Sequence, residues 1–379
     1  MNIAYVSTYD VKDIRQFSGL GYYIAQALEM QSIPLEYICP LKERCSLLFK
    51  GKVYFYKQLL HQRYFRDREP FILKEYAKQV SDKLSQINSD IVFSPGTIPI
   101  SYLECDRPIA FWTDSNFASM INFYPQFSNM CEETIKNGNA MEKAALQKCS
   151  LAIYSSEWAA KTAIENYHVE QSKVKVVPFG ANIDCDRNVN DVKNLIESRP
   201  TNLCKLLFLG VDWFRKGGNI ALEVTKELNK SGLKTELTII GCEPITDELP
   251  NFITPLGFIS KLIQSGKKQI EKIISESHFL ILPTIADCSP HALAEANSFG
   301  VPCISTNVGG IPTIVKDNIN GKLFDKDSLT TEYCQYISHI FANYPEYKKL
   351  AFSAFNEYQL NLNWSVAGQT VKKLLENIQ

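Results

Sequence analysis

The chain has 379 residues, which is long enough for two or three domains and excludes a peptide or a single small module. Hydrophobic residues make up 45% and charged residues 21%, a composition that indicates a folded globular protein rather than a disordered one. Forty Lys and Arg residues stand against 41 Asp and Glu residues, so the net charge is -1 and no overall basic field attracts nucleic acid. We therefore expect no nucleic-acid partner.

The cysteines and histidines predict neither a disulfide framework nor a metal site. The 11 cysteines include no C-x-x-C pair, and several stand inside apolar runs, which favours a reducing compartment. The 5 histidines lack metal-ligand spacing. The triplet Asp184, Cys185, Asp186 resembles a D-x-D metal motif, but we interpret it as solvated loop carboxylates. The sequence has no signal-like start and no run of 18 apolar residues, so we expect a cytoplasmic protein. Peripheral contact with the inner face of the membrane stays open.

Short apolar runs alternate with longer helical patterns, which is typical of parallel sheets covered by helices. The strands predicted in the first half are 2–7, 34–38, 90–94, 108–112, 151–155 and 174–178. Its predicted helices lie near 19–30, 70–88, 131–147 and 156–167. The strands predicted in the second half are 204–210, 236–241, 252–257, 278–283 and 301–306. Its predicted helices lie near 217–231, 266–276, 290–299 and 328–344.

These two series predict an α/β protein with two Rossmann-like domains. A polar stretch without a strand pattern lies between them, and we place a linker at 185–202. The predicted domains are then 1–184 and 203–344. The segment 345–379 has only helical periodicity, with a break around Asn361 and Asn363, and we expect its helices to pack back on the first domain.

A glycine-containing turn, SGLGYYIAQAL, follows the first strand and opens a helix. Gly19 and Gly21 have no Cβ atom, so a ligand can approach the backbone there, and a helix N-terminus offers N–H groups to an anion. A helix cap with tight packing explains the same pattern. Both interpretations stay open, and a dinucleotide fingerprint is incomplete because Ile24 stands where a third glycine belongs.

Two segments of the second half carry groups suited to a phosphorylated ligand. FLGVDWFRKGGNIALEV predicts a strand, a glycine turn and a helix, which puts Arg215 and Lys216 at the edge where open α/β sheets bind ligands. The alternative is a solvated basic turn. In ADCSPHALAEANSFG, Asp287 and Glu295 stand on either side of a helix start. We expect the backbone amides of His291, Ala292 and Leu293 to point outward there as an anion cradle. The alternative is a capping Asp287 and an internally paired Glu295.

Taken together, FLGVDWFRKGG, TIIGCEP, PLGFIS and LILPTIADCSPHALAEANSFGVPCIST resemble the nucleotide-sugar half of GT-B-fold, family 4 retaining glycosyltransferases (glycosyl transferases group 1). SGLGYYIAQAL and LAIYSSEWAAKTAIENYHVEQSKVKVVPFGANID resemble the other half more loosely. The resemblance implies two Rossmann-like domains with parallel sheets facing across a cleft, and C-terminal helices that cross back to the first domain. It implies transfer of a hexose-type sugar from a nucleotide-diphosphate sugar to an acceptor hydroxyl, with retention of anomeric configuration.

The resemblance also assigns roles by position. Lys216 contacts the donor diphosphate, Glu295 binds the ribose hydroxyls, and the loop from Asp287 to Leu293 holds the sugar and phosphates. Gly257, Phe258 and Ile259 bracket the base, and Gly19 and Gly21 line the cleft beside the transferred sugar. The candidate catalytic residues are Lys216, Asp287, Glu295 and Asp114. The candidate donor-binding residues are Gly19, Gly21, Arg215, Lys216, Gly257, Phe258, Ile259, Ser289, His291, Ala292, Leu293 and Glu295.

Three positions depart from the family pattern. Asp287 stands where the family has a glutamate, and Val211 stands where it usually has an arginine, for which Arg215 is our candidate substitute. The N-domain position that often carries a histidine reads FWTDSNF, so Asp114 is the nearest polar candidate there, unless it caps the next turn.

The mechanism that the resemblance implies is electrostatic and metal-independent. The family lacks a well-placed nucleophile and uses the departing phosphate as base, while cations and helix amides stabilise the leaving diphosphate. No cofactor is expected beside the nucleotide sugar, for which UDP is favoured over GDP. The acceptor is a small molecule, a glycan or a lipid-linked molecule. The alternatives are a sugar-nucleotide epimerase, a phosphorylase, or a non-catalytic nucleotide-sugar-binding protein. An NAD-dependent dehydrogenase is disfavoured.

The segment 41–84 is basic and aromatic, with 11 Lys and Arg residues against 5 Asp and Glu residues. Such a surface docks onto an anionic membrane or a phosphorylated acceptor. We favour the alternative, in which the charges form a solvated face and the aromatic residues lie in the core.

Overall fold

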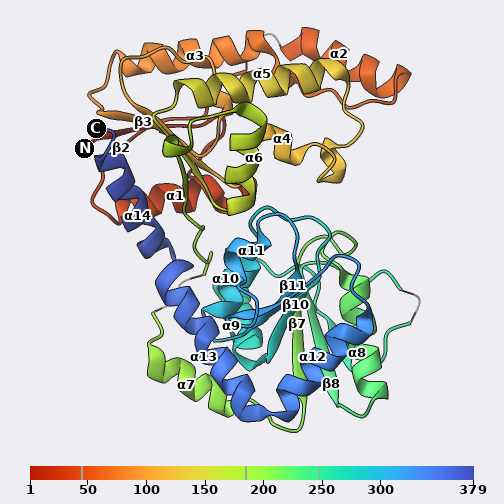
Figure 1. The fold of residues 1–379 in the computed structure, drawn as a ribbon. Helices are drawn as coiled ribbons and strands as arrows, with labels where there is room; N and C mark the ends of the chain where they lie inside the picture. Colours follow the sequence, from red (N-terminus) through yellow and green to blue (C-terminus); the bar gives the residue numbers. More distant parts are fainter. Residues whose placement is uncertain (44–45, 184–185, 247) are drawn as a thin grey trace. The chain divides into compact units, whose positions relative to one another are not determined.

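The computed structural model describes residues 1–43, 46–183, 186–246 and 248–379 (Figure 1). They form two compact units: unit 1 contains residues 1–178 and 364–379, and unit 2 contains residues 179–363. The predicted boundary at 184–185 lies outside the described residues. Among the described helices, none has the length and hydropathy needed to cross a bilayer.

Unit 1 is built on a six-stranded, all-parallel sheet in the order β2-β1-β3-β4-β5-β6. Its strands are β1 (Ile3–Val6), β2 (Leu35–Ile38), β3 (Ile91–Ser94), β4 (Ile109–Thr113), β5 (Leu151–Tyr154) and β6 (Val174–Val176). Its helices are α1 (Leu20–Glu29), α2 (Ser46–Leu59), α3 (Pro70–Leu84), α4 (Phe117–Met120), α5 (Glu132–Lys148), α6 (Glu157–Tyr167) and α14 (Trp364–Glu376).

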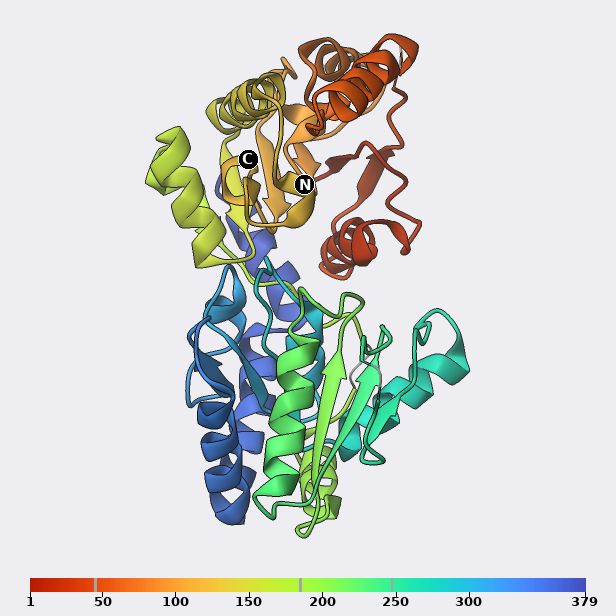
Figure 2. The same cartoon turned by 90° about the vertical axis from the view of Figure 1, so that its right-hand side faces the viewer.

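Alternate strand residues of this sheet serve two different helix layers (Figures 1 and 2). Val92, Phe111 and Tyr154 share a buried cluster with residues of α3, α5 and α6. On the other face lies Trp112, whose ring contacts Trp364 at the start of α14. Because both faces of the inner strands β1, β3, β4 and β5 are buried, these strands have the continuous apolar pattern that the sequence shows.

Unit 2 is a second six-stranded parallel sheet, in the order β12-β11-β10-β7-β8-β9. Its strands are β7 (Cys204–Leu209), β8 (Thr235–Ile240), β9 (Ile253–Pro255), β10 (Phe279–Leu282), β11 (Cys303–Thr306) and β12 (Gly321–Phe324). Its helices are α7 (Val189–Ser198), α8 (Gly218–Lys230), α9 (Gln264–Glu276), α10 (His291–Asn297), α11 (Ile311–Ile314), α12 (Thr330–Ala342) and α13 (Tyr344–Asn361). The predicted fold class, two Rossmann-like units with parallel sheets, is confirmed.

The segments around the predicted linker and tail differ from the prediction. The stretch predicted as a linker contains helix α7, which Asn188 caps by accepting bonds from the backbone N–H groups of Asn190 and Asp191. The break at Asn361 and Asn363 is real, since α13 ends and α14 begins there. However, α13 belongs to unit 2, and only α14 belongs to unit 1.

Arg199 joins four helices of unit 2. Its buried guanidinium, just after α7, donates to the carbonyls of Ser275 at 3.1 Å, Phe299 at 2.8 Å and Gly300 at 2.8 Å, and to the hydroxyl of Tyr347 at 2.6 Å. These acceptors lie at the end of α9, after α10, and on α13. A planar group with five N–H donors suits this set, whereas an ammonium cannot reach all of it.

Arg199→Lys is expected to lower the free energy of unfolding by about 3 kcal/mol, because it keeps a buried charge and leaves carbonyls without donors. Chemical denaturation measures the loss. Arg15→Lys, at an exposed arginine paired with Asp13, is the matched control and is expected to change little. Equal midpoints for the two variants would contradict the role of Arg199.

Glu142 on α5 is a buried acid in unit 1. Its Oε2 accepts from the hydroxyl of Thr97 at 3.0 Å and from the backbone N–H of Phe117 at 3.3 Å. Burial raises the pKa of Glu142 from 4.5 to about 7, against the smaller opposite effects of these bonds and of Arg68. The native protein therefore holds this proton at pH values where the unfolded chain releases it.

Glu142→Gln is expected to gain stability relative to the wild type as pH rises from about 4.5 to 7, by about 3 kcal/mol in all. The sign follows because the contribution of the protonated acid is complete below pH 4.5 and is lost as pH rises through the pKa in the folded state. Thermal unfolding across this range measures it. A constant difference between the two proteins would contradict the assignment.

Candidate functional site

The loop after β7 is shaped by two glycines that no other residue can replace without a shift. Gly217, at the N-cap of α8, has φ +79°, and a Cβ there would lie 2.0 Å from the carbonyl oxygen of Pro283. At Gly218, a Cβ would lie 2.2 Å from the ring of Trp213. The chain therefore passes directly against the loop after β10, and this contact brings the basic pair to that loop.

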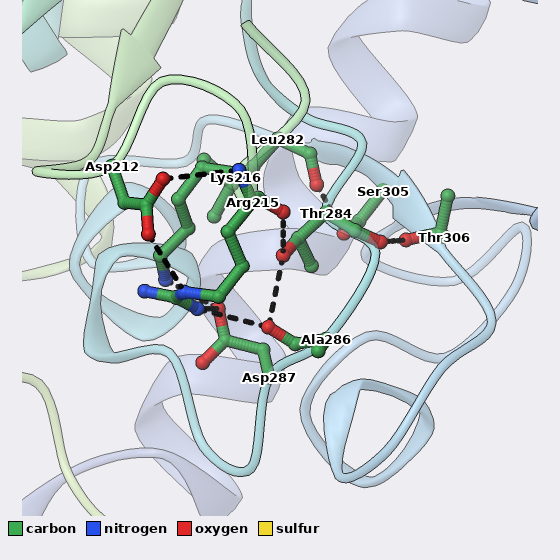
Figure 3. A network of polar contacts seen from close by, with 9 residues as sticks. All are labelled: Asp212, Arg215, Lys216, Leu282, Thr284, Ala286, Asp287, Ser305 and Thr306. Atoms are coloured by element: carbon green, nitrogen blue, oxygen red, sulfur yellow. Dashed lines mark hydrogen bonds and ion pairs between the residues drawn. The ribbon is translucent and has the colours of Figure 1, made fainter. Parts of the chain in front are cut away.

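Arg215 and Lys216 meet at the carboxylate of Asp287, as Figure 3 shows. Arg215 Nη1 lies 3.5 Å from Asp287 Oδ2 and donates to the carbonyl of Ala286 at 2.9 Å, while its Nε donates to Asp212 at 3.3 Å. Lys216 Nζ donates to the same Asp287 Oδ2. Lys216 is 9% exposed and Asp287 is 6% exposed, so the two cations share a largely desolvated carboxylate, while the more exposed Asp212 pairs with Arg215.

Hydroxyl groups hold the loops around this cluster in place (Figure 3). The hydroxyl of Thr284 donates to the carbonyl of Arg215 at 2.8 Å, and the hydroxyl of Thr306 donates to the carbonyl of Thr284. The hydroxyl of Ser305 donates to the carbonyl of Leu282 at 2.7 Å. The loops that follow β7 and β10 are therefore joined to the end of β11 at the carboxyl edge of the sheet, where parallel sheets bind ligands.

Glu295 lies on α10 and is 1% exposed. Its Oε1 accepts from Lys261 Nζ, and its Oε2 is buried and has no hydrogen-bond partner in the described part of the chain. The alternative prediction, an internally paired Glu295, is therefore confirmed, while its binding of ribose hydroxyls stays a prediction. The sequence analysis missed Lys261, although it directly follows the PLGFIS motif.

The helix start after Asp287 differs from the predicted amide cradle at one position. Helix α10 begins at His291, with Pro290 at its N-cap. The backbone N–H of Leu293 donates to the carbonyl of Pro290 at 3.1 Å, so it does not point outward as predicted, because the first turn closes with this bond. His291 and Ala292 lie half-buried beside Ser289 at the same end of α10.

His291 is held as a neutral ring. Its Nδ1 donates to the carbonyl of Gly180 at 3.1 Å, and its ring stacks on Phe179 with centroids 5.9 Å apart. Desolvation lowers the pKa of His291, more than the nearby carboxylate of Glu295 raises it. The side chain therefore offers hydrogen bonds rather than positive charge to this edge of the sheet.

The loop predicted to bracket a base follows β9. Gly257 has φ +61°, and its carbonyl accepts from the backbone N–H of Gly241 at 2.8 Å. Phe258 is 74% exposed, while Ile259 packs partly against the core. Val211, which stands after β7 where the family usually has an arginine, is also exposed. The loop thus offers an exposed aromatic ring at Phe258, while the carbonyl of Gly257 is engaged within the unit.

The unit 1 candidates lie after β1 and β4. Gly19 caps α1 with φ +79°. Gly21 is enclosed by two tyrosines: its carbonyl accepts from the hydroxyl of Tyr5 at 2.9 Å, and a Cβ would lie 2.7 Å from the hydroxyl oxygen of Tyr9. Tight packing therefore explains both glycines within unit 1, without requiring a ligand.

Asp114 does not cap the helix that follows it. The cap of α4 is Asn116, which forms a reciprocal capping box with Ser119, while Asp114 accepts from the hydroxyl of Ser115 at 3.0 Å. Burial raises the pKa of Tyr9, and the nearby carboxylate of Asp114 adds to the rise. Tyr9 is thus a neighbour of Asp114 that the sequence analysis did not identify.

We favoured an arrangement in which the aromatic residues of segment 41–84 lie in the core. The structure contradicts this for several of them. Tyr64 is buried, but the side chains of Tyr54, Phe55, Leu59, Leu60 and Phe71 are 48–68% exposed. Exposed cations lie among them on α2, after α2 and on α3, namely Lys50, Lys57, Arg63, Lys74 and Lys78. This surface, which we call the α2–α3 surface, is both basic and apolar.

No metal cluster is found among residues that the structure describes: no group of three or more His, Cys, Asp or Glu side chains is close enough to share an ion. Asp184 and Cys185 of the D-x-D triplet lie outside the described residues.

Comparison with known proteins finds similarity over part of the chain. Residues 193–356 match the family described as glycosyl transferases group 1. Among curated proteins, the Escherichia coli UDP-Gal:alpha-D-GlcNAc-diphosphoundecaprenol alpha-1,3-galactosyltransferase is 25% identical over 173 residues. That match covers 44% of this chain and 45% of the relative, so the chain spans less than half of that enzyme's length.

Solved structures resemble the whole chain. Sucrose-phosphate synthase from Thermosynechococcus elongatus matches with a TM-score of 0.69 at 14% identity, covering 100% of this chain and 98% of the other. Anabaena HepE in complex with UDP and glucose matches with a TM-score of 0.62 at 14% identity, covering 99% of each chain. At these identities the likeness establishes the fold, which is GT-B.

Proposed function

We propose that this chain, whose residues 193–356 match the glycosyl transferases group 1 family, transfers a hexose-type sugar from a nucleotide-diphosphate sugar to an acceptor hydroxyl. The observation that carries the proposal is the edge of the unit 2 sheet. There two cations share one buried carboxylate, and Glu295 presents a buried oxygen without a partner among the described residues.

The donor groups each meet a chemically suitable partner in this assignment. Lys216 and Arg215 face the diphosphate, since each has N–H groups beyond those bonded to Asp287. Glu295 Oε2 accepts from a ribose hydroxyl, which removes the cost of a buried oxygen without a donor. Phe258 and the backbone of Gly257 and Ile259 contact the base. We favour UDP, the nucleotide bound by the Anabaena protein.

The proposed reaction retains the anomeric configuration and needs neither a metal nor a cofactor. The bond from the sugar's anomeric carbon to the leaving phosphate oxygen breaks. The acceptor oxygen forms its bond on the same face, and the acceptor proton passes to the departing phosphate. Lys216, Arg215 and the amides of His291 and Ala292 stabilise the charge that builds on the diphosphate. Asp287 holds both cations in position, and the loop that includes Ser289 contacts the sugar.

We assign the acceptor to unit 1, where Asp114, Gly19 and Gly21 remain the candidates. The acceptor is a glycan or a lipid-linked molecule, and we propose that the α2–α3 surface contacts the inner face of an anionic membrane. Exposed aromatic rings beside lysines and arginines suit the headgroup region, where rings enter the interface and cations meet lipid phosphates. The E. coli relative is named for a diphosphoundecaprenol-linked substrate, which supports a lipid-linked acceptor.

An epimerase, a phosphorylase or a non-catalytic binding protein would use the same donor site. An epimerase would convert the donor without an acceptor, a phosphorylase would need inorganic phosphate, and a binding protein would show no turnover. Incubation of a UDP-sugar with the protein, with and without candidate acceptors or phosphate, separates them.

Donor binding is tested by thermal unfolding with UDP, GDP, ADP and NAD. A nucleoside diphosphate at about a hundredfold excess over its Kd is expected to stabilise the wild type by about 2.7 kcal/mol. Glu295→Ala and Lys216→Ala are expected to lose this stabilisation and to abolish transfer while remaining folded, since Arg215 still pairs with Asp287. Lys268→Ala, at an exposed position of α9, is the control. Stabilisation by NAD alone, or by none of the four, would overturn the proposed donor site.

Membrane contact is tested by co-sedimentation with phosphatidylcholine vesicles that contain or lack phosphatidylglycerol. We expect binding only to the anionic vesicles, weakening as salt rises. The double variant Lys50→Glu, Lys57→Glu is expected to lose binding. The control Lys268→Glu, Lys272→Glu makes the same charge change on α9 and is expected to keep it. Equal binding by both double variants would show that the α2–α3 surface is not responsible.

A further inference from the structure

Lys261 links the loop after β9, which we assign to the base, to Glu295, which we assign to the ribose. It lies between β9 and α9, and its Nζ donates to Glu295 Oε1 on α10, 34 positions later in the chain. The side chain of Lys261 is 36% exposed, while that of Glu295 is 1% exposed. The ammonium thus approaches the buried carboxylate from the side that faces solvent.

The backbone around Lys261 is held by the turn that it belongs to. The backbone N–H of Leu262 donates to the hydroxyl of Ser260 at 3.3 Å, and that of Ile263 donates to the carbonyl of Ser260 at 3.4 Å. The first turn of α9 packs against the same carbonyl at Gly266, where a Cβ would lie 2.3 Å from it. The loop therefore fixes where the Lys261 side chain starts.

The ion pair changes what Glu295 presents to a diol. A carboxylate with both oxygens open binds two neighbouring hydroxyls as a fork. Here Oε1 is engaged by Lys261, and Oε2 is the buried oxygen without a partner among the described residues. An ammonium has three N–H donors, so Lys261 can bond Glu295 and still donate to another oxygen beside it.

We propose that Lys261 is a specificity-determining residue that reads the donor ribose together with Glu295. Glu295 Oε2 accepts from one of the two ribose hydroxyls, and Lys261 Nζ donates to the oxygen of the other. The inference rests on the proposed function, because it takes the nucleotide-sugar donor as the ligand. It predicts that the two hydroxyls are recognised by different side chains.

The test measures binding of UDP, 2′-deoxy-UDP and 3′-deoxy-UDP to the full chain by isothermal titration calorimetry. The proteins are the wild type, Lys261→Met, Lys261→Arg, Lys268→Met and Glu295→Ala. The wild type is expected to bind each deoxy form roughly tenfold more weakly than UDP, since each lacks a charge-assisted hydrogen bond. Lys268→Met is expected to match the wild type, because Lys268 is exposed on α9.

Lys261→Met is expected to bind UDP about tenfold more weakly and to lose discrimination against one deoxy form only. Lys261→Arg is expected to keep that discrimination, since a guanidinium also donates. Glu295→Ala is expected to lose discrimination against the other form. A Lys261→Met variant that weakens all three ligands by one factor has lost structural support alone, and that result overturns the inference, as does unchanged binding. Tighter UDP binding by this variant would overturn it as well.

The inference and the proposed function fail in different ways. If the wild type binds none of UDP, GDP and ADP, the donor site itself is wrong and the inference falls with it. If the wild type binds UDP and Glu295→Ala weakens binding, the proposed function stands whatever Lys261→Met does. Thermal unfolding of each variant without ligand checks that all are folded.

Discussion

The carboxylate of Asp287 is the group on which the ligand edge of unit 2 depends. Arg215 and Lys216 approach it from the loop after β7, and Asp287 itself lies after β10. Without this anion, the two neighbouring cations would have only the more exposed Asp212, which pairs with Arg215, to balance them. The backbone carbonyl of Asp287 also accepts from the N–H of Gly310, after β11, so one residue connects three strand ends.

The shorter side chain of Asp287 goes together with its pairing to Arg215 and Lys216. The family that the sequence resembles has glutamate there, whereas aspartate keeps its carboxylate one methylene closer to its own backbone. In this protein the carboxylate points to the two cations. This arrangement keeps the cations in fixed positions without a ligand, which is how preorganised sites avoid reorganisation during a reaction.

Much of the fold was predictable because the inner strands are buried on both faces and so read as short apolar runs. Strand β12 (Gly321–Phe324) was missed because it is a four-residue edge strand that contains a glycine and a lysine and is only half-buried in its middle. At the site, the glycine turn with Arg215 and Lys216 and the segment from Asp287 to Glu295 were found because each is local in sequence. The partner of Glu295 was not found, because Lys261 lies 34 positions away and only the packed sheet brings the two together. Likewise, nothing local shows that Gly21 is enclosed by Tyr5 and Tyr9.

Helix α14 belongs to unit 1 although unit 2 separates it in sequence from the rest of that unit. Trp364 stacks on Tyr23 of α1 with ring centroids 5.8 Å apart, and Lys372 Nζ donates to the carbonyl of Gln31 at 3.0 Å. Unit 2 is one continuous stretch, so all its residues come from a single segment of the chain. Unit 1 is discontinuous, and Trp112 on β4 meets Trp364 only across the whole length of unit 2 in the sequence. The completion of the first sheet therefore depends on a helix that the chain supplies only after it has passed through the second.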